Sequence, residues 1–109
     1  RKDKDAEAQR TAKSVMVTPM DNHVEIHYCN QCRWLLRSAW MAQELLTTFE
    51  EEIAELTLRP GTGGVFEVSV NGRLVWSRRE AGRFPEIKEL KQRVRDEIAP
   101  DKGLGHSDK

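Results

Sequence analysis

Two cysteines stand three positions apart, as Cys29-Asn30-Gln31-Cys32, and they are the only two in the chain. Residues 23–28, just before them, alternate polar and apolar side chains, which predicts a half-buried strand. From residue 33 to residue 49 the apolar side chains recur every three or four positions, as in an amphipathic helix. At such a strand-to-helix junction, unpaired backbone N–H groups and the helix dipole stabilise a thiolate, which is the species that attacks a disulfide. The pair is therefore predicted to be a redox site.

The sequence leaves open which of the two sulfurs attacks. Cys29 is expected at the N-cap of the helix, where the positive helix end favours the thiolate. Cys32 is expected within the first turn, where the dipole also acts and where Arg33 or Arg37 adds positive charge. We therefore assign both cysteines to the catalytic site and leave their order undecided.

The elements around the dithiol follow from periodicity. Val24, Ile26 and Tyr28 lie on one face of the first predicted strand. The predicted buried stripe of the helix consists of Leu35, Ala39, Ala42, Leu46 and Phe49. Because the acidic residues 50–52 are unfavourable at the negative end of a helix dipole, we expect this helix to end near Phe49.

Three further strands are predicted in the second half of the chain, the last two of them in a hairpin. Residues 54–59 alternate and form a second strand, and residues 60–64, Pro-Gly-Thr-Gly-Gly, form a loop. Residues 65–70 and 73–77 are joined by Asn71-Gly72, the preferred pair for a two-residue type I′ turn.

A last helix begins with Pro85 in its first turn and ends before Pro100. Its buried stripe is Ile87, Leu90, Val94 and Ile98. The order strand–helix–strand–strand–strand–helix gives an α/β, thioredoxin-like plan, β-α-β-β-β-α. Right-handed crossover makes the first two strands parallel, so we expect a mixed four-stranded sheet of order 2-1-3-4 with two main helices. The dithiol is then expected at the carboxyl end of a central strand.

Four segments resemble the selenoprotein W-like (Rdx) family, which includes SelT, SelW and SelH: Tyr28-Cys29-Asn30-Gln31-Cys32, Gly64-Val65-Phe66-Glu67-Val68, Val70-Asn71-Gly72 and Gly82-Arg83-Phe84-Pro85. The resemblance covers roughly residues 23–99 and implies a thioredoxin-like fold with a redox role. Selenocysteine-containing members carry selenium at the second position of the motif, so the resemblance implies a cysteine-containing, bacterial-type member. It also points to Cys32 as the attacking residue. Asn30-Gln31 replaces the Gly-Pro of the thioredoxin motif.

Length and composition limit the other possibilities. A chain of 109 residues holds one domain, and 38% hydrophobic with 33% charged residues indicates polar tails. We expect a flexible segment at 1–21, a domain at 22–100 and a disordered tail at 101–109.

Net charge is zero and basic residues are interleaved with acidic ones, so we expect no nucleic-acid partner. No apolar run reaches the roughly 20 residues of a membrane span, so no membrane partner is expected.

These features predict a thiol–disulfide oxidoreductase that needs no cofactor. Its expected partners are protein or glutathione thiols and disulfides. The expectation that glutathione is a partner rests on the family resemblance alone. Two cysteines are too few for a secreted disulfide scaffold, which predicts a cytoplasmic location. The alternative is a redox-regulated interaction module without turnover, whose partner surface would be Trp34, Trp40 and Met41.

Two other possible sites are a zinc site and a nucleotide-phosphate loop. With His23 and His27, the cysteines could form a zinc site, although the chain has no second Cys-x-x-Cys pair. The glycine-rich loop at 61–64 precedes a strand and lacks the following Gly-Lys-Ser/Thr, so it is not a nucleotide-phosphate loop. In thioredoxin-like folds this loop faces the dithiol, with Thr62 or Gly63 expected nearest to it.

Overall fold

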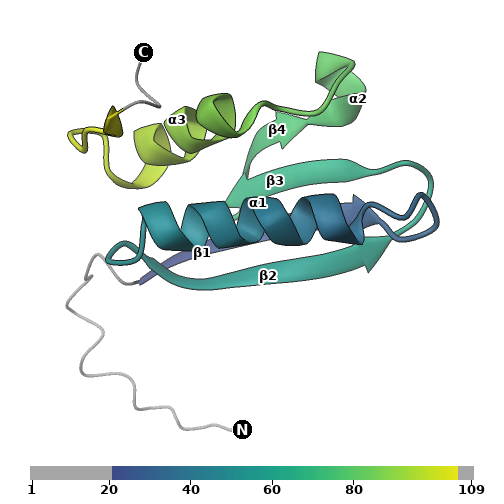
Figure 1. Cartoon of the computed structure of the whole chain (residues 1–109), viewed down its shortest axis with the longest axis horizontal. Helices are drawn as coiled ribbons and strands as arrows, with labels where there is room; N and C mark the ends of the chain where they lie inside the picture. The colour runs from purple at the N-terminus through teal and green to yellow at the C-terminus, as the bar shows by residue number, and fades with distance from the viewer. Residues whose placement is uncertain (1–20, 106–109) are drawn as a thin grey trace, which may run out of the picture.

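The computed structural model describes residues 21–105 and consists of a four-stranded sheet with its two longer helices packed against one face (Figure 1). The strands are β1 (Asn22–Cys29), β2 (Ile53–Gly61), β3 (Phe66–Val70) and β4 (Arg73–Ser77), and the helices are α1 (Leu35–Thr48), α2 (Arg78–Ala81) and α3 (Ile87–Ile98). The sheet order is β2-β1-β3-β4, with β1 parallel to β2 and antiparallel to β3. The predicted topology is confirmed.

The two faces of strand β1 differ in polarity. Val24 and Ile26 are fully buried under the helices and Tyr28 nearly so, as their spacing predicts. The other face carries polar side chains, among them Glu25, whose Oε2 lies 2.6 Å from Nε of Arg59 on the neighbouring strand. The core therefore lies between the sheet and the two longer helices.

The hairpin between β3 and β4 has the predicted turn. Asn71 and Gly72 have φ angles of 52° and 83°, the left-handed pair that a type I′ turn requires. The Asn71 side chain also accepts a hydrogen bond from the backbone N–H of His23 at 2.9 Å and donates one to Oδ1 of Asn22 at 3.0 Å. The turn is thereby joined to the start of the strand that carries the dithiol.

The rotation of α1 about its axis differs from the prediction. The helix ends at Thr48, near the expected position, but Leu35 and Leu46 of the predicted stripe are 45% and 41% exposed. The buried residues of this helix are Ser38, Met41, Ala42 and Leu45, with Phe49 at its C-cap. The sequence of α1 is apolar around most of its circumference, so periodicity alone does not fix which side faces the sheet.

Three other boundaries are corrected by the structure. Pro60 and Gly61 belong to β2 rather than to the loop; β2 is an edge strand, where the missing proline N–H is tolerated. The short helix α2 was not predicted, and Ser77 caps it by accepting a hydrogen bond from the N–H of Glu80 at 3.4 Å. Pro85 lies before the N-cap of α3 rather than in its first turn.

The packed part of the chain continues past the predicted boundary at residue 100. Leu104 packs against the core, and Nζ of Lys102 lies 3.4 Å from Oε2 of Glu52. The predicted flexible segment at 1–21 falls on residues 1–20 except for its last residue, and the predicted tail at 101–109 includes residues 106–109; residues 1–20 and 106–109 lie outside the described residues.

The N-terminus of α3 is held by a charged pair. Arg83 forms two parallel hydrogen bonds of 2.9 Å with the carboxylate of Glu89, which also accepts from the backbone N–H of Glu86 at 3.2 Å. These hydrogen bonds lower the pKa of Glu89 from 4.5 to about 2, and those from Arg83 have the largest effect. Because the pKa is lower in the folded state, the stabilisation is present above about pH 4.5 and is lost as the pH falls toward 2.

Glu89→Gln is therefore expected to lower the free energy of unfolding at neutral pH by about 1–2 kcal/mol. The difference from the wild type should shrink as the pH falls below about 4.5, because the wild-type carboxylate then protonates. Urea unfolding at several pH values measures this. Asp96→Asn is the control: Asp96 pairs with Arg95 at 3.1 Å but is 67% exposed, so its loss should change stability by less than about 0.5 kcal/mol. A pH-independent difference for Glu89→Gln would contradict the assignment.

Candidate dithiol site

The structure brings the two cysteines together at the end of β1. Cys29 is the last residue of the strand and Cys32 lies in the following turn, with 2.7 Å between their sulfurs. Both are free thiols, and the Cys32 thiol donates its hydrogen to the Cys29 sulfur. Cys29 is completely buried, whereas Cys32 is exposed. Of the two sulfurs, Cys32 is therefore the one that a substrate can reach.

A tight turn, not a helix, holds this geometry. The N–H of Arg33 donates to the carbonyl of Asn30 at 3.0 Å, and the N–H of Trp34 donates to the carbonyl of Cys29 at 3.4 Å. Arg33 has a φ of 64°, a left-handed conformation that cannot continue as an α-helix. The N-cap of α1 is consequently Trp34. The predictions that Cys29 is the N-cap and that Cys32 lies in the first helical turn are wrong.

The two thiols differ in their proton affinity. Burial raises the pKa of Cys29, but hydrogen bonds from the Cys32 thiol and from the backbone N–H groups of Gly64, Cys32 and Gln31 outweigh it, so the pKa is lowered overall. The pKa of Cys32 is raised, first because its hydrogen is held by Cys29, then by desolvation and by the nearby negative charge. The first proton to leave the pair therefore leaves more readily than from an ordinary cysteine.

The loop before β3 faces the dithiol, as expected for this fold. The carbonyl of Gly61, the last residue of β2, accepts a hydrogen bond from the N–H of Asn30 at 2.9 Å, which ties the start of the loop to the dithiol turn. Gly64, rather than Thr62 or Gly63, directs its N–H to both sulfurs and lowers the pKa of each thiol. Its φ of +76° is unfavourable for a residue with a Cβ. The loop was predictable from its glycines and proline, but this contact was not.

A cluster of aromatic rings and arginines borders the dithiol turn. Trp34 and Phe84 meet edge to face with 4.8 Å between ring centroids. The guanidinium of Arg37 lies 4.1 Å from the centroid of Phe84, and that of Arg78 lies 5.0 Å from Trp34 and 5.1 Å from Phe84. The positive charge of Arg78 also acts to lower the pKa of Cys32. Arg78 carries no sequence signal for this role, since it lies 46 positions after Cys32.

The two histidines of β1 lie on the polar face of the sheet. Nδ1 of His23 is 3.2 Å from a carboxylate oxygen of Glu55, and Nδ1 of His27 is 3.2 Å from Nη2 of Arg59. Within residues 21–105, no group of three or more histidine, cysteine or carboxylate side chains is arranged to hold a metal ion.

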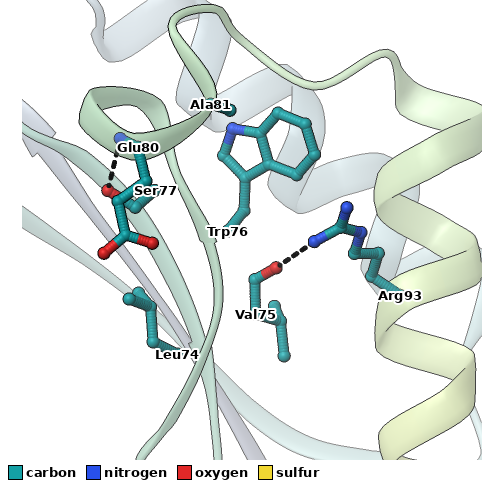
Figure 2. Close-up of a pocket in the computed structure, with 7 residues that line it drawn as sticks. All are labelled: Leu74, Val75, Trp76, Ser77, Glu80, Ala81 and Arg93. Atoms are coloured by element: carbon teal, nitrogen blue, oxygen red, sulfur yellow. Dashed lines mark hydrogen bonds between the residues drawn. The ribbon is translucent and has the colours of Figure 1, made fainter.

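A pocket of about 320 Å³ lies elsewhere, between β4, α2 and α3. Figure 2 shows its seven lining residues: Leu74, Val75, Trp76, Ser77, Glu80, Ala81 and Arg93. Arg93 reaches from α3 and donates to the carbonyl of Val75 at 3.1 Å, so the polar groups of this pocket partly satisfy one another. Neither cysteine lines it.

The predicted partner surface is only partly exposed. Met41 is 2% exposed and belongs to the core, which removes it from the surface that sequence predicted. Trp34 is half-buried in the aromatic cluster, while Trp40 is 48% exposed and Leu36, four positions before it on α1, is 83% exposed. In the part of the chain that the structure describes, every helix is too short or too polar to cross a membrane.

Residues 23–96 match the model of the Rdx family. Two similar curated proteins are both named "Migration and invasion enhancer 1". The mouse (Mus musculus) protein is 35% identical over 75 residues, which cover 67% of this chain. The bovine (Bos taurus) protein is 32% identical over 74 residues, which cover 66% of this chain. The chain spans 62% and 61% of their respective lengths.

Solved structures give closer matches. A selenoprotein W-related protein from Vibrio cholerae is 58% identical with a TM-score of 0.69, and the match covers 71% of this chain and 96% of that one. A protein from Bordetella parapertussis is 57% identical with a TM-score of 0.69, covering 71% and 98%. The thioredoxin-like fold is shared with these neighbours. The family match, which includes the paired cysteines at the end of β1, shows that the chain belongs to the Rdx family.

Proposed function

We propose that the protein is a thiol–disulfide oxidoreductase in which Cys32 attacks the substrate and Cys29 resolves the intermediate. The observation that carries this proposal is the asymmetry of the pair: an exposed sulfur lies 2.7 Å from a fully buried one whose pKa is lowered. Accessibility decides the order here, because a buried thiolate cannot meet a disulfide in another molecule, however readily it ionises.

The first step uses the hydrogen bond between the sulfurs. Once the pair has lost one proton, the remaining hydrogen can move from Cys32 to Cys29 across their 2.7 Å contact, which leaves the negative charge on the exposed sulfur. The Cys32 thiolate attacks one sulfur of the substrate disulfide. A new S–S bond forms to Cys32, the substrate S–S bond breaks, and the departing sulfur takes a proton.

The second step closes the intramolecular bond. Cys29 loses its hydrogen, and its sulfur attacks Cys32 in the mixed disulfide and displaces the second substrate sulfur, which is released as a thiol. The substrate has then gained two electrons and two protons, and the protein holds a Cys29–Cys32 disulfide. A dithiol or two molecules of a monothiol, such as glutathione, return the pair to the reduced state and are themselves oxidised to a disulfide.

Membership of the Rdx family supports a redox role, and a chain with only two cysteines fits a reducing compartment such as the cytoplasm. The proposed chemistry needs no cofactor, because both electrons come from the two sulfurs.

Turnover is the direct test of this function. The wild type is expected to accelerate the reduction of insulin by dithiothreitol at least about tenfold over a Cys29→Ser/Cys32→Ser double variant. A stoichiometric reaction with a peptide disulfide should convert both protein thiols to one disulfide, which mass spectrometry detects as a loss of two hydrogens. Equal rates for the wild type and the double variant would contradict the enzymatic proposal.

The second candidate function is a redox-regulated interaction module. It is favoured by the exposure of Leu36 and Trp40, which lie on adjacent turns of α1 shortly after the dithiol. In this case oxidation of the pair would alter the binding of a protein partner without turnover. Loss of two hydrogens on oxidation together with no acceleration of insulin reduction would favour this function over the first.

A further inference from the structure

Two arginines next to the dithiol turn have no carboxylate partner among residues 21–105. Arg37 and Arg78 contact the rings of Phe84 and Trp34, and neither forms an ion pair with any of residues 21–105. Most arginines elsewhere in the described domain do meet an acid. The pairs are Arg59 with Glu25, Arg73 with Glu97, Arg83 with Glu89 and Arg95 with Asp96. The positive charge beside Cys32 is therefore left unneutralised by the described residues.

The stacking of these arginines prepares them to bind an anion. A guanidinium that lies over an aromatic ring has its orientation restricted, while the N–H groups at its edge stay available. Nε of Arg78 is buried and has no acceptor among residues 21–105, so a substrate carboxylate would bind this guanidinium through its two Nη groups. Carboxylates match the planar fork of arginine and form two parallel hydrogen bonds with it.

The position of the pair relates it to the reacting sulfur. Trp34, which Arg78 contacts, is two residues after Cys32, and its N–H is bonded to the carbonyl of Cys29 at 3.4 Å. Arg37 occupies the first turn of α1 and shares Phe84 with Arg78. A polypeptide whose disulfide reaches Cys32 would bring its neighbouring side chains close to these two guanidinium groups.

We propose that Arg37 and Arg78 select polypeptide substrates that carry carboxylates beside the disulfide. This inference rests on the proposed oxidoreductase function and adds a substrate preference to it. Acidic residues flanking the substrate cysteine bind the stacked guanidinium groups and hold the disulfide at Cys32.

The test compares two peptide disulfides that differ only in having Glu or Gln on each side of the cysteine. The rate of mixed-disulfide formation is measured with the Cys29→Ser protein, in which the first step is isolated. At low salt the Glu peptide is expected to react about three- to tenfold faster. The preference should largely disappear at about 1 M salt, where screening acts over about 3 Å.

In the same background, Arg37→Gln and Arg78→Gln should each reduce the Glu-to-Gln rate ratio, and together bring it close to one. Using the ratio cancels any change in the Cys32 thiol itself, since both peptides meet the same sulfur. Arg79→Gln is the matched control: Arg79 is exposed on the same short helix but does not contact the aromatic cluster, so the ratio should stay within about 1.5-fold of its starting value.

A binding measurement keeps the inference testable apart from the chemistry. The same two peptides with Ser in place of cysteine are titrated into the reduced wild type, and the indole N–H signal of Trp34 is followed by NMR. Tighter binding of the Glu peptide that is lost in the double arginine variant supports the inference even if no peptide disulfide is reduced. Equal binding of both peptides, or a preference that survives both substitutions, would overturn it.

Discussion

Replacing Cys32 with serine is expected to slow the reaction of the protein with a polar alkylating reagent by at least about 100-fold at neutral pH. The remaining thiol, Cys29, is fully buried, so the reagent can reach it only after local opening of the structure. Cys29→Ser should by contrast label readily, because the exposed sulfur is retained. Single-variant labelling followed by mass spectrometry measures both rates.

The pH dependence of labelling separates ionisation from access. In the wild type we expect two steps, one below and one above the ordinary thiol pKa, because the pKa of Cys29 is lowered and that of Cys32 is raised. The largest cause of the raised pKa of Cys32 is the hydrogen bond to Cys29. Cys29→Ser removes the negative sulfur that accepts this bond, so labelling of Cys32 should show a single step at a pH between the two.

Trapping of mixed disulfides is expected to identify the same attacking cysteine, Cys32. Cys29→Ser should accumulate mixed disulfides through Cys32, because no second sulfur is present to resolve them. Cys32→Ser should accumulate none, although its Cys29 can still ionise, which thiolate ultraviolet absorbance detects as a control. Fast labelling and trapping through Cys29 in the Cys32→Ser variant would reverse the assignment and make the buried sulfur the nucleophile.

The fold was predictable because its signals are local. Alternation in residues 23–28 and the Asn71-Gly72 turn each specify one conformation, and the strand–helix–strand connection makes the first two strands parallel. The arrangement of the site was less predictable. The left-handed Arg33 that separates Cys32 from α1 belongs to a residue type that rarely adopts this conformation, so no sequence signal marks it.

The electrostatics of the site come from residues remote in sequence. Gly64 acts on both sulfurs from the loop before β3, and Arg78 acts on Cys32 from α2. The family resemblance included Gly64 and Phe84, which line the site, but it gave no reason to connect Arg78 with them. Position along the chain does not reveal which side chains the fold brings to the end of β1.

The rotation of α1 is the other feature that periodicity did not determine, and it leads to a large expected effect on stability. Leu45 and Leu36 lie on the same helix, but Leu45 is fully buried against the sheet and Leu36 is 83% exposed. The same substitution at both sites removes the same atoms and changes helix propensity equally. Any difference between the two variants therefore reports burial.

Leu45→Ala is expected to lower the free energy of unfolding by about 2–5 kcal/mol, since it removes packed methyl groups and leaves a cavity between α1 and the sheet. For a domain of this size that corresponds to a fall in Tm of at least about 8 °C. Leu36→Ala should change stability by less than about 0.5 kcal/mol. Thermal and urea unfolding of both variants measure the contrast. Similar losses at the two positions would mean that α1 presents a different side to the sheet, and the exposed Leu36 and Trp40 could then no longer serve as a partner surface beside the dithiol.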